Sequence, residues 1–291
     1  MEEGLIIKGY GGFYFVRSGK ETWRCRGRGR LRRDGSLLVG DRVLFTKIDS
    51  KEGLIEAILP RKNSIQRPPV ANVDQMILVV SLAQPEPDLK LLNRTLVLGE
   101  MEKLEILICF NKVDLVAREK AESLEEIYRK AGYRTLLTSA LEKIGVTELY
   151  QSLAAERRIS VLAGPSGAGK STLLNTIDPG LSLATGEISP KLKRGRHTTR
   201  YVQLLPIGNG YVADTPGFSN LELPSIKRTE LARYFPEIRE YAGKCRFLDC
   251  LHIDEPDCEV KNALKRGIIS NIRYQDYQRF LGEIIDKERM Y

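Results

Sequence analysis

Short apolar runs separated by turn residues dominate the first part of the chain. Their alternation of apolar and polar positions is typical of half-buried strands, and the glycine, serine and aspartate residues between them favour tight turns. The pattern predicts five strands, over Leu5–Ile7, Phe13–Arg17, Thr22–Arg26, Val43–Lys47 and Leu54–Leu59. Five short strands in about 60 residues fit a small barrel, so we predict an OB-type β-barrel over residues 1–68.

From residue 69 onward, continuous apolar runs alternate with segments of helical spacing. Continuous runs are typical of buried parallel strands, and they occur at Met76–Leu82, Ile106–Phe110, Arg134–Thr138 and Ile159–Ala163. Helices are predicted over Leu89–Glu102, Ala121–Ala131 and Val146–Glu156, and a hairpin over Tyr201–Leu205 and Tyr211–Ala213. Residues 69–222 are therefore predicted to form an α/β domain with about six strands.

The last part of the chain is helical again and surrounds a cysteine-rich segment. Amphipathic helices are predicted over Lys227–Tyr241, Glu259–Arg266 and Asn271–Arg289. These helices define a third, α-helical domain over residues 223–291, while Arg67-Pro68-Pro69 is predicted to be a stiff linker after the barrel.

Composition adds limits to this picture. The chain has 291 residues, of which 42% are hydrophobic and 29% charged, a balance that excludes wholesale disorder. No apolar run approaches the roughly 18 residues of a membrane-spanning helix. The first residues have acids where a signal peptide has bases. We therefore expect a cytoplasmic protein without a membrane partner, and a monomer.

The positive charge is concentrated in the predicted barrel. The formal net charge is +8, and residues 1–68 hold 15 Lys and Arg against 8 Asp and Glu. Six of these arginines lie in the run Arg24–Arg33, and Tyr10, Phe13, Tyr14, Phe15 and Trp23 are nearby in the sequence. Basic barrel faces with aromatic rings bind nucleic acid. The alternative for the charge is a solvated basic surface. The alternative for the aromatic residues is that most of them belong to the core, as we expect for at least half.

The strongest chemical signal is a phosphate-loop motif of the form GxxxxGK[ST]. It follows a predicted strand and precedes a helical segment, the context that such a loop needs. Glycines let backbone N–H groups close around phosphates, and the helix N-terminus adds its dipole. Lys170 is predicted to reach the β- and γ-phosphates, and the Ser171 hydroxyl to bind Mg²⁺. The predicted phosphate-binding residues are Gly164, Pro165, Ser166, Gly167, Ala168, Gly169, Lys170, Ser171 and Thr172.

A second motif, Asn111-Lys112-Val113-Asp114, resembles the guanine-reading NKxD loop of GTPases. The Asp114 carboxylate can accept hydrogen bonds from the guanine ring N–H and exocyclic amine, a donor pair that adenine lacks. Asn111 can serve the other edge of the base, and Lys112 can pack over the ribose. The pair Ser139-Ala140 resembles the short SA loop, in which a backbone N–H meets the guanine carbonyl.

Two further segments resemble the switches of GTPases. The sequence from Asp214 to Gly217 matches DxxG, in which the aspartate holds a Mg²⁺-bound water and the glycine N–H senses the γ-phosphate. Between it and the phosphate loop, the segment Arg196–Arg200 contains Thr198 and Thr199. We favour Thr199 as the threonine that completes the Mg²⁺ shell when GTP is bound.

The order of these motifs is unusual, because NKxD and SA precede the phosphate loop, the switch threonine and DxxG. The set is complete but circularly permuted. After DxxG the chain therefore leaves the sheet and enters the helical region, which gives nucleotide state a route to a partner surface. The sequence thus predicts a permuted P-loop GTPase fold for the central domain.

Cysteine spacing indicates a metal site in the C-terminal domain. Cys245, Cys250, His252 and Cys258 provide three thiolates and one imidazole within a short segment, which suits a closed tetrahedral structural Zn²⁺ site. The alternative is a set of buried free cysteines beside an unrelated histidine. The remaining two cysteines lie in predicted strands and are expected to be packed in the core.

The barrel, the permuted core and the Cys/His segment together closely resemble the RsgA (YjeQ) family of small-subunit-dependent GTPases. The resemblance spans essentially the whole chain and rests on GPSGAGKS, RGRHTT, DTPG and NKVD. It implies GTP hydrolysis stimulated by the small ribosomal subunit, during late maturation of that subunit, with contacts to its rRNA. It also implies the same Cys/His ligand pattern for zinc.

The residue after DTPG is Phe218, where Ras-like enzymes carry a water-orienting glutamine. Because phenylalanine cannot orient water, catalysis must come from His197, a backbone group or the partner, and we predict slow intrinsic turnover with strong stimulation by a partner. Our candidate for the catalytic residue is His197, a role to which the resemblance also points. An exposed or rRNA-contacting histidine is the alternative. Two rival functions remain. The first is an RNA-binding maturation factor whose nucleotide site is only a switch or a relic, and the second is a P-loop ATPase or small-molecule kinase, against which NKVD argues.

Overall fold

The computed structural model describes residues 1–29, 31, 37–66, 69–183, 202–214, 223–224 and 226–289. The chain divides into two compact units. One comprises Met1–Ile77 and Val146–Phe218, and the other comprises Leu78–Gly145 and Ser219–Tyr291. The division passes through strand β8 (Gln75–Ser81), so the predicted central domain contributes to both units.

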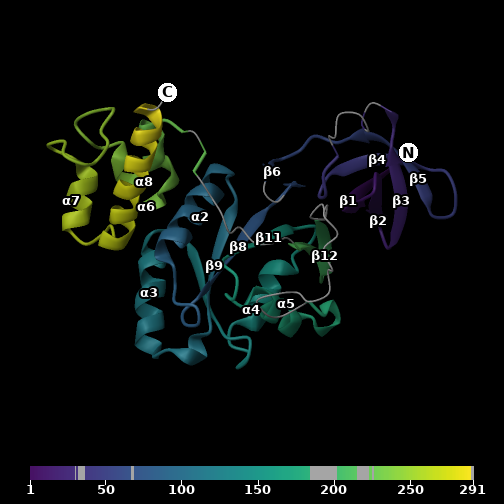
Figure 1. Ribbon diagram of the computed structural model, residues 1–291, viewed down its shortest axis with the longest axis horizontal. Coiled ribbons are helices and arrows are strands. Elements are labelled where there is room, and N and C mark those ends of the chain that lie inside the picture. The colour runs from purple at the N-terminus through teal and green to yellow at the C-terminus, as the bar shows by residue number, and fades with distance from the viewer. Residues whose placement is uncertain are drawn as a thin grey trace. The chain divides into compact units, whose positions relative to one another are not determined.

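The N-terminal strands close into a five-stranded barrel, shown in purple in Figure 1. The strands are β1 (Glu2–Tyr10), β2 (Phe13–Ser18), β3 (Glu21–Gly27), β4 (Arg42–Lys47) and β5 (Glu52–Ile58). They pair in the order β1-β2-β3-β5-β4, and β4 returns to β1. All these pairs are antiparallel except β3–β5. This closed order confirms the predicted OB-type barrel, and alternate residues such as Val16 and Phe45 fill its core.

The segment after the barrel, where a stiff linker was predicted, contains two short paired strands that are docked on the barrel. Strands β6 (Ser64–Gln66) and β7 (Pro69–Ala71) pair with each other, and Val70 forms a bridge with Val39. Gly40 has φ +89°, and an added Cβ would lie 2.1 Å from the Ala71 carbonyl oxygen, so the hairpin approaches closely. Pro69 is tolerated because it begins a short edge strand, where no ladder N–H is needed.

A partly buried ion pair fixes the same segment to the barrel. The fully buried Asp41 carboxylate accepts hydrogen bonds from the Arg61 guanidinium at 2.6 and 2.8 Å and from the Leu38 N–H at 2.7 Å. The hydrogen bond to Asp41 raises the pKa of Arg61. The barrel is thus held to the strand that leads into the α/β sheet.

The first unit continues the sheet beyond the barrel. Strand β8 neighbours β11 (Ile159–Ala163), which pairs parallel with β13 (Gly210–Asp214), and β13 forms the predicted hairpin with β12 (Gln203–Ile207). Helices α4 (Val146–Leu153) and α5 (Lys170–Ile177) precede and follow β11, and a short 3₁₀ turn, η2 (Pro179–Leu181), follows α5. Gln75 of β8 links α4 to β11, because its buried amide donates to the Ser152 carbonyl and to Ser160 Oγ at 2.8 Å each.

The second unit contains the other α/β elements. Strand β9 (Glu105–Asn111) lies between β8 and β10 (Arg134–Thr138), and β9 and β10 are parallel. Its helices are α2 (Leu89–Met101), α3 (Arg118–Lys130) and the 3₁₀ turn η1 (Val113–Leu115). The six strands from β8 to β13 match the number predicted from the apolar runs.

The C-terminal region is helical, with one correction to the sequence prediction. Its elements are the 3₁₀ helix η3 (Arg228–Tyr234), α6 (Pro236–Ala242), α7 (Glu259–Lys265) and α8 (Asn271–Arg289). The single helix predicted over Lys227–Tyr241 is wrong, because Phe235 is extended, with φ −119° and ψ 99°. Pro236 disfavours helical backbone at the residue before it. Within the described residues, no helix combines the length and apolar character needed to cross a membrane.

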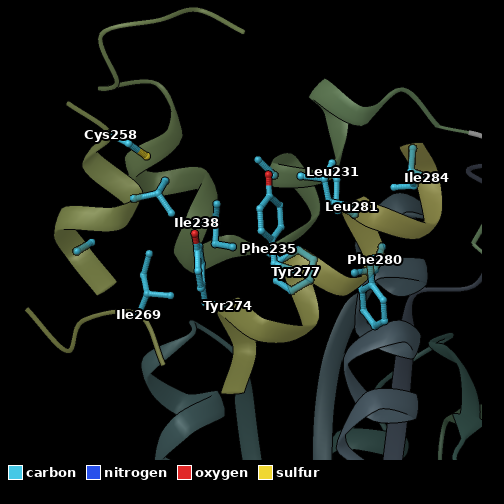
Figure 2. Close-up of a cluster of buried hydrophobic side chains, with 14 of the residues drawn as sticks. Leu231, Phe235, Ile238, Cys258, Ile269, Tyr274, Tyr277, Phe280, Leu281 and Ile284 are labelled. Carbon is cyan, nitrogen blue, oxygen red and sulfur yellow. The ribbon is translucent and has the colours of Figure 1, made fainter. Parts of the chain in front are cut away.

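Aromatic packing builds the core of this helical region (Figure 2). The ring of Phe235 meets the rings of Tyr277 and Phe280 at centroid distances of 5.4 and 6.4 Å. In Figure 2 the rings of Phe235 and Tyr277 lie side by side. Val97 of α2 belongs to the same buried cluster, so the helical region shares a core with the α/β part of its unit.

A buried polar network crosses that core. Arg273 of α8 is fully buried, donates to Glu237 at 2.7 and 3.1 Å, and donates to Asn93 of α2 at 2.9 Å. Asn93 in turn donates to Asp276 at 2.6 Å. The Arg273 guanidinium also lies 4.7 Å from the Phe235 ring centroid. Because every partner is buried, the network fixes α2, α6 and α8 to one another.

We expect Arg273→Met to lower the free energy of unfolding by about 3–5 kcal/mol, because it leaves the Glu237 carboxylate buried without its cation. The matched control is the double variant Arg273→Met with Glu237→Met, which removes both charges and should regain much of the loss. Denaturant unfolding monitored by the fluorescence of the aromatic residues measures both. Equal destabilisation by the single and double variants would contradict the role assigned to the ion pair.

Candidate GTP site, zinc centre and nucleic-acid face

The predicted phosphate loop has the predicted context, since it joins buried strand β11 to helix α5. Gly164, Gly167 and Gly169 have φ values of +130°, +77° and +96°, which other residues adopt only with strain. The loop therefore turns tightly enough to present its backbone N–H groups. Ser171 and Thr172 are half-buried in the first turn of α5.

Lys170 lies folded over this loop. Its Nζ donates to the carbonyl oxygens of Gly164 and Pro165, at 2.7 Å each. Burial lowers the pKa of the Lys170 ammonium. An ammonium held by two loop carbonyls is placed to exchange them for phosphate oxygens, which are stronger partners.

The predicted base-reading loop follows β9 in the second unit. Asn111 is buried, and its side-chain oxygen accepts a hydrogen bond from Thr138 Oγ1 at 3.1 Å. Lys112 has the left-handed φ of +66°, and its ammonium donates to the Gln84 carbonyl. Asp114 follows in turn η1 with an exposed side chain. The loop backbone is thus anchored while the carboxylate stays accessible to a base.

The predicted SA loop lies beside the same anchor, because Thr138 ends β10. Ser139 is fully buried, its N–H donates to the Ile144 carbonyl at 3.0 Å, and its Oγ accepts from the Glu142 N–H at 3.1 Å. Ala140 is half-buried. Residues far apart in the sequence, at 111 and 138–140, therefore form one structured edge of the β9–β10 pair.

Several predicted residues are outside the described part of the chain. These are His197, Thr198, Thr199, Gly217 and Phe218, and of Asp214 only the backbone is described, at the end of β13. Their assignments stay predictions.

The Cys/His segment forms a compact cluster, as predicted. The ligand atoms of Cys245, Cys250, His252 and Cys258 all lie within 4.8 Å of one another. His252 Nδ1 lies 3.6 Å from Cys245 Sγ and 3.4 Å from Cys258 Sγ, and these two sulfurs are 3.8 Å apart. Tetrahedral bonds of about 2.3 Å to sulfur and about 2.0 Å to nitrogen require separations near 3.8 and 3.5 Å. The cluster therefore fits a zinc ion.

Neighbouring groups hold this cluster in shape. The Glu255 carboxylate accepts from the Leu251 and Ile253 N–H groups at 2.7 and 2.9 Å. The Tyr277 hydroxyl of α8 donates to the Leu251 carbonyl at 3.0 Å. Burial raises the pKa of the Cys258 thiol and lowers the pKa of His252. Buried thiols of this kind become ligands when a cation stabilises their thiolates.

Loss of a residue that only hydrogen-bonds to a metal ligand lowers metal affinity by roughly 10–100-fold. Because Cys258→Ser removes a predicted ligand itself, we expect it to lower zinc affinity by well over that factor. The purified protein should contain one zinc per chain by elemental analysis, and the variant much less. Cys109→Ser is the matched control, because Cys109 is a buried cysteine in β9, where burial raises its pKa to about 12. Absence of zinc from the unaltered protein would refute the assignment.

The outer face of the barrel combines cations with aromatic rings. Strand register places Lys8, Phe15 and Arg24 in one row, and the Lys8 ammonium lies 5.9 Å from the Phe15 ring centroid. The Arg24 and Arg26 guanidinium carbons lie 4.7 and 4.4 Å from the Phe13 ring centroid. This arrangement supports the predicted nucleic-acid face.

Two details qualify the sequence prediction for this face. Trp23 is buried and belongs to the core, as expected for part of the aromatic set, whereas Tyr10 is 56% exposed. Arg24 and Arg28 form ion pairs with Glu52 and Glu56 of β5, so part of the arginine charge is already compensated. Sequence reading missed Lys8, because only strand pairing brings it beside the arginines.

The fold and the two loops define a circularly permuted GTPase, in which the base-reading loop precedes the phosphate loop along the chain. Family models agree: the model for the RsgA GTPase matches residues 58–224, and that for the RsgA N-terminal domain matches residues 3–55. The chain belongs to the RsgA GTPase family and is a GTP hydrolase.

Individual relatives resemble the chain over nearly its full length. The small ribosomal subunit biogenesis GTPase RsgA of Carboxydothermus hydrogenoformans is 48% identical, with 99% of each chain covered. The crystal structure of YloQ, a circularly permuted GTPase, has a TM-score of 0.82 and 39% identity, covering 99% of this chain and 96% of that one. YjeQ from Thermotoga maritima gives 0.84 and 39%, covering 98% of each.

Proposed function

We propose that this GTPase binds the small ribosomal subunit in the cytoplasm and assists its late maturation. The subunit stimulates hydrolysis of GTP to GDP and phosphate. The observation that carries the proposal is the pairing of an intact phosphate loop and base-reading loop with full-length similarity to a protein named for small-subunit biogenesis. A monomer is the form we expect to act.

In this proposal each site residue has a specific task. The loop N–H groups and Lys170 bind the phosphates, Asn111 and Asp114 read guanine, and the Ser139-Ala140 backbone meets the guanine carbonyl. Mg²⁺, when bound, would supply positive charge that offsets the charge of the phosphates. Ser171 and Thr199 would hold this ion, and Asp214 would hold one of its waters.

Zinc has a structural role in the proposal. All four ligands come from the protein, so no position is open for substrate. The ion shapes the cysteine-rich loop on the aromatic core of the helical domain. The barrel face with Arg24 and Arg26 contacts rRNA, in the manner of basic surfaces that neutralise backbone phosphates.

The decisive experiment measures GTP turnover by the full chain alone, with purified small subunits and with purified large subunits. We expect slow turnover that only small subunits accelerate. Lys170→Ala, tested beside the unaltered protein, distinguishes turnover by this site from turnover by a contaminating enzyme. No acceleration by small subunits would overturn the proposal. Competition of labelled GTP by ATP against GDP separates a GTPase from the rival ATPase or kinase.

A further inference from the structure

A cavity of about 640 Å³ lies in the first unit, away from the phosphate loop. Its walls include Leu5 and Arg17 of the barrel and Ile159, the first residue of β11. The phosphate loop leaves β11 at the opposite end, after Ala163. Since strand residues rise by about 3.3 Å each, the two ends are separated by on the order of 13 Å. The cavity is therefore a second, distinct concave surface.

Strand register brings two arginines to this cavity. On β1, Leu5 pairs with Arg17 of β2 on one side and with Arg42 of β4 on the other, so the three residues form a row across the barrel. Arg157 reaches the same cavity from the loop before β11. Arginines from three separate segments thus converge, which linear sequence does not reveal.

The acidic groups of the cavity do not cancel this charge. The Asp74 carboxylate is already occupied by Lys62 Nζ at 3.2 Å and by the Ile159 N–H at 2.9 Å. Glu3 is the other acid that lines the cavity. Because Lys62 compensates Asp74, the three arginines face one further carboxylate, that of Glu3, and the surface is net positive.

Two of the arginines are available for a ligand. Arg42 is exposed, and within the described residues its guanidinium has no ion pair. Arg157 approaches Glu156 only at 3.9 Å, with side chains 74% and 80% exposed, and an ion pair of that kind contributes little. The cavity therefore offers uncommitted guanidinium groups, the preferred partners of phosphate oxygens.

We propose that this cavity binds the phosphodiester backbone of an RNA strand. The cavity adjoins the nucleic-acid face along β2. Phe15 lies in the row with Lys8 and Arg24, and Arg17, which lines the cavity, follows Phe15 by two residues and so lies on the same face of the strand. One strand can thus pass from the aromatic face into the cavity, with its phosphates on the cavity arginines. Cations spread over three segments fit successive phosphates better than one small anion. The inference rests on the proposed function, since rRNA supplies the strand.

The test compares the double variant Arg42→Gln with Arg157→Gln against a control that removes equal charge elsewhere, Arg118→Gln with Arg129→Gln. Both control side chains are exposed on α3, at 85% and 67%. Arg157 has a φ of +56°, and because glutamine also has a Cβ, the substitution adds no backbone strain there. The full chain is titrated with fluorescein-labelled single-stranded RNA at several salt concentrations, and with inorganic pyrophosphate in a separate arm.

We expect the cavity variant to lose RNA affinity by about tenfold or more for each arginine that binds a phosphate. Its slope of log affinity against log salt should become shallower by roughly 0.7 for each phosphate that the variant no longer neutralises. The control should keep both values, and all three proteins should bind GDP equally. Equal RNA binding by cavity variant and unaltered protein overturns the inference, as does a loss confined to pyrophosphate.

These outcomes are distinct from failure of the proposed function. If the unaltered protein binds RNA and is stimulated by small subunits while the cavity variant behaves identically, only the cavity inference fails. If the unaltered protein gains no turnover from small subunits, the proposed function fails first.

Discussion

Asp114→Asn is expected to convert the protein from a guanine-specific to a xanthine-preferring nucleotide hydrolase. In the predicted site the carboxylate would accept two hydrogen bonds from guanine, whereas an amide could accept only one while presenting an N–H to the exocyclic amine. Losing charged hydrogen bonds of about 1.5–3 kcal/mol each lowers GDP affinity by on the order of 10²–10⁴-fold. Xanthine has a carbonyl at the position of that amine and accepts the new donor.

The structure makes this substitution a clean test. Asp114 is exposed in turn η1, and no side-chain hydrogen bond caps that turn, so the fold does not depend on the carboxylate. Glu119→Gln, at an exposed acid in the first turn of α3, is the matched control. Fluorescent GDP is displaced by GDP or by xanthosine diphosphate. Unchanged preference for GDP would show that another residue reads the base.

Contiguous motifs were predictable from the sequence because their chemistry is local. The phosphate loop needs a strand, glycines and a helix in immediate succession, and residues 159–177 provide all three. The Cys/His cluster was equally predictable, since a short segment contains all four of its residues. The barrel followed from alternating strands with turn residues between them, although its closure through β1 and β4 required the structure.

Features assembled from distant segments were not predictable in this way. Arg273 looks like one more charged residue of an amphipathic helix, yet it is fully buried against Glu237 and Asn93. Burial of an arginine depends on partners supplied by other helices, and no local pattern records them. The row that joins Arg17 to Arg42 through Leu5 is a property of strand register in the same sense.

In one segment, a proline interrupts a helix that the apolar spacing predicts. The apolar pattern over 227–241 is helical throughout, but Pro236 forces Phe235 out of helical backbone. The break is useful to the fold, since it directs the Phe235 ring into the core beside Tyr277. A proline inside a periodic segment is therefore stronger evidence for a helix boundary than the periodicity is for a continuous helix.

The largest catalytic effect is expected from His197→Ala. Phe218 occupies the place of the usual water-orienting glutamine, so another group must position the attacking water. The sequence has two histidines, and His252 belongs to the Cys/His cluster. His197 lies next to the threonines predicted to close over the γ-phosphate. A neutral imidazole can accept a hydrogen bond from water and hold it in line.

The variant should therefore bind GTP and GDP normally while subunit-stimulated hydrolysis falls on the order of 10²–10⁴-fold, the contribution of positioned acid–base groups. Because the GTP form persists, the variant should also stay on the small subunit longer, as measured by co-sedimentation. His197→Gln is the informative companion, since an amide can orient water as it does in Ras-like enzymes and should restore part of the rate. Near-normal stimulated turnover in His197→Ala would exclude this residue and leave the subunit itself to position the water.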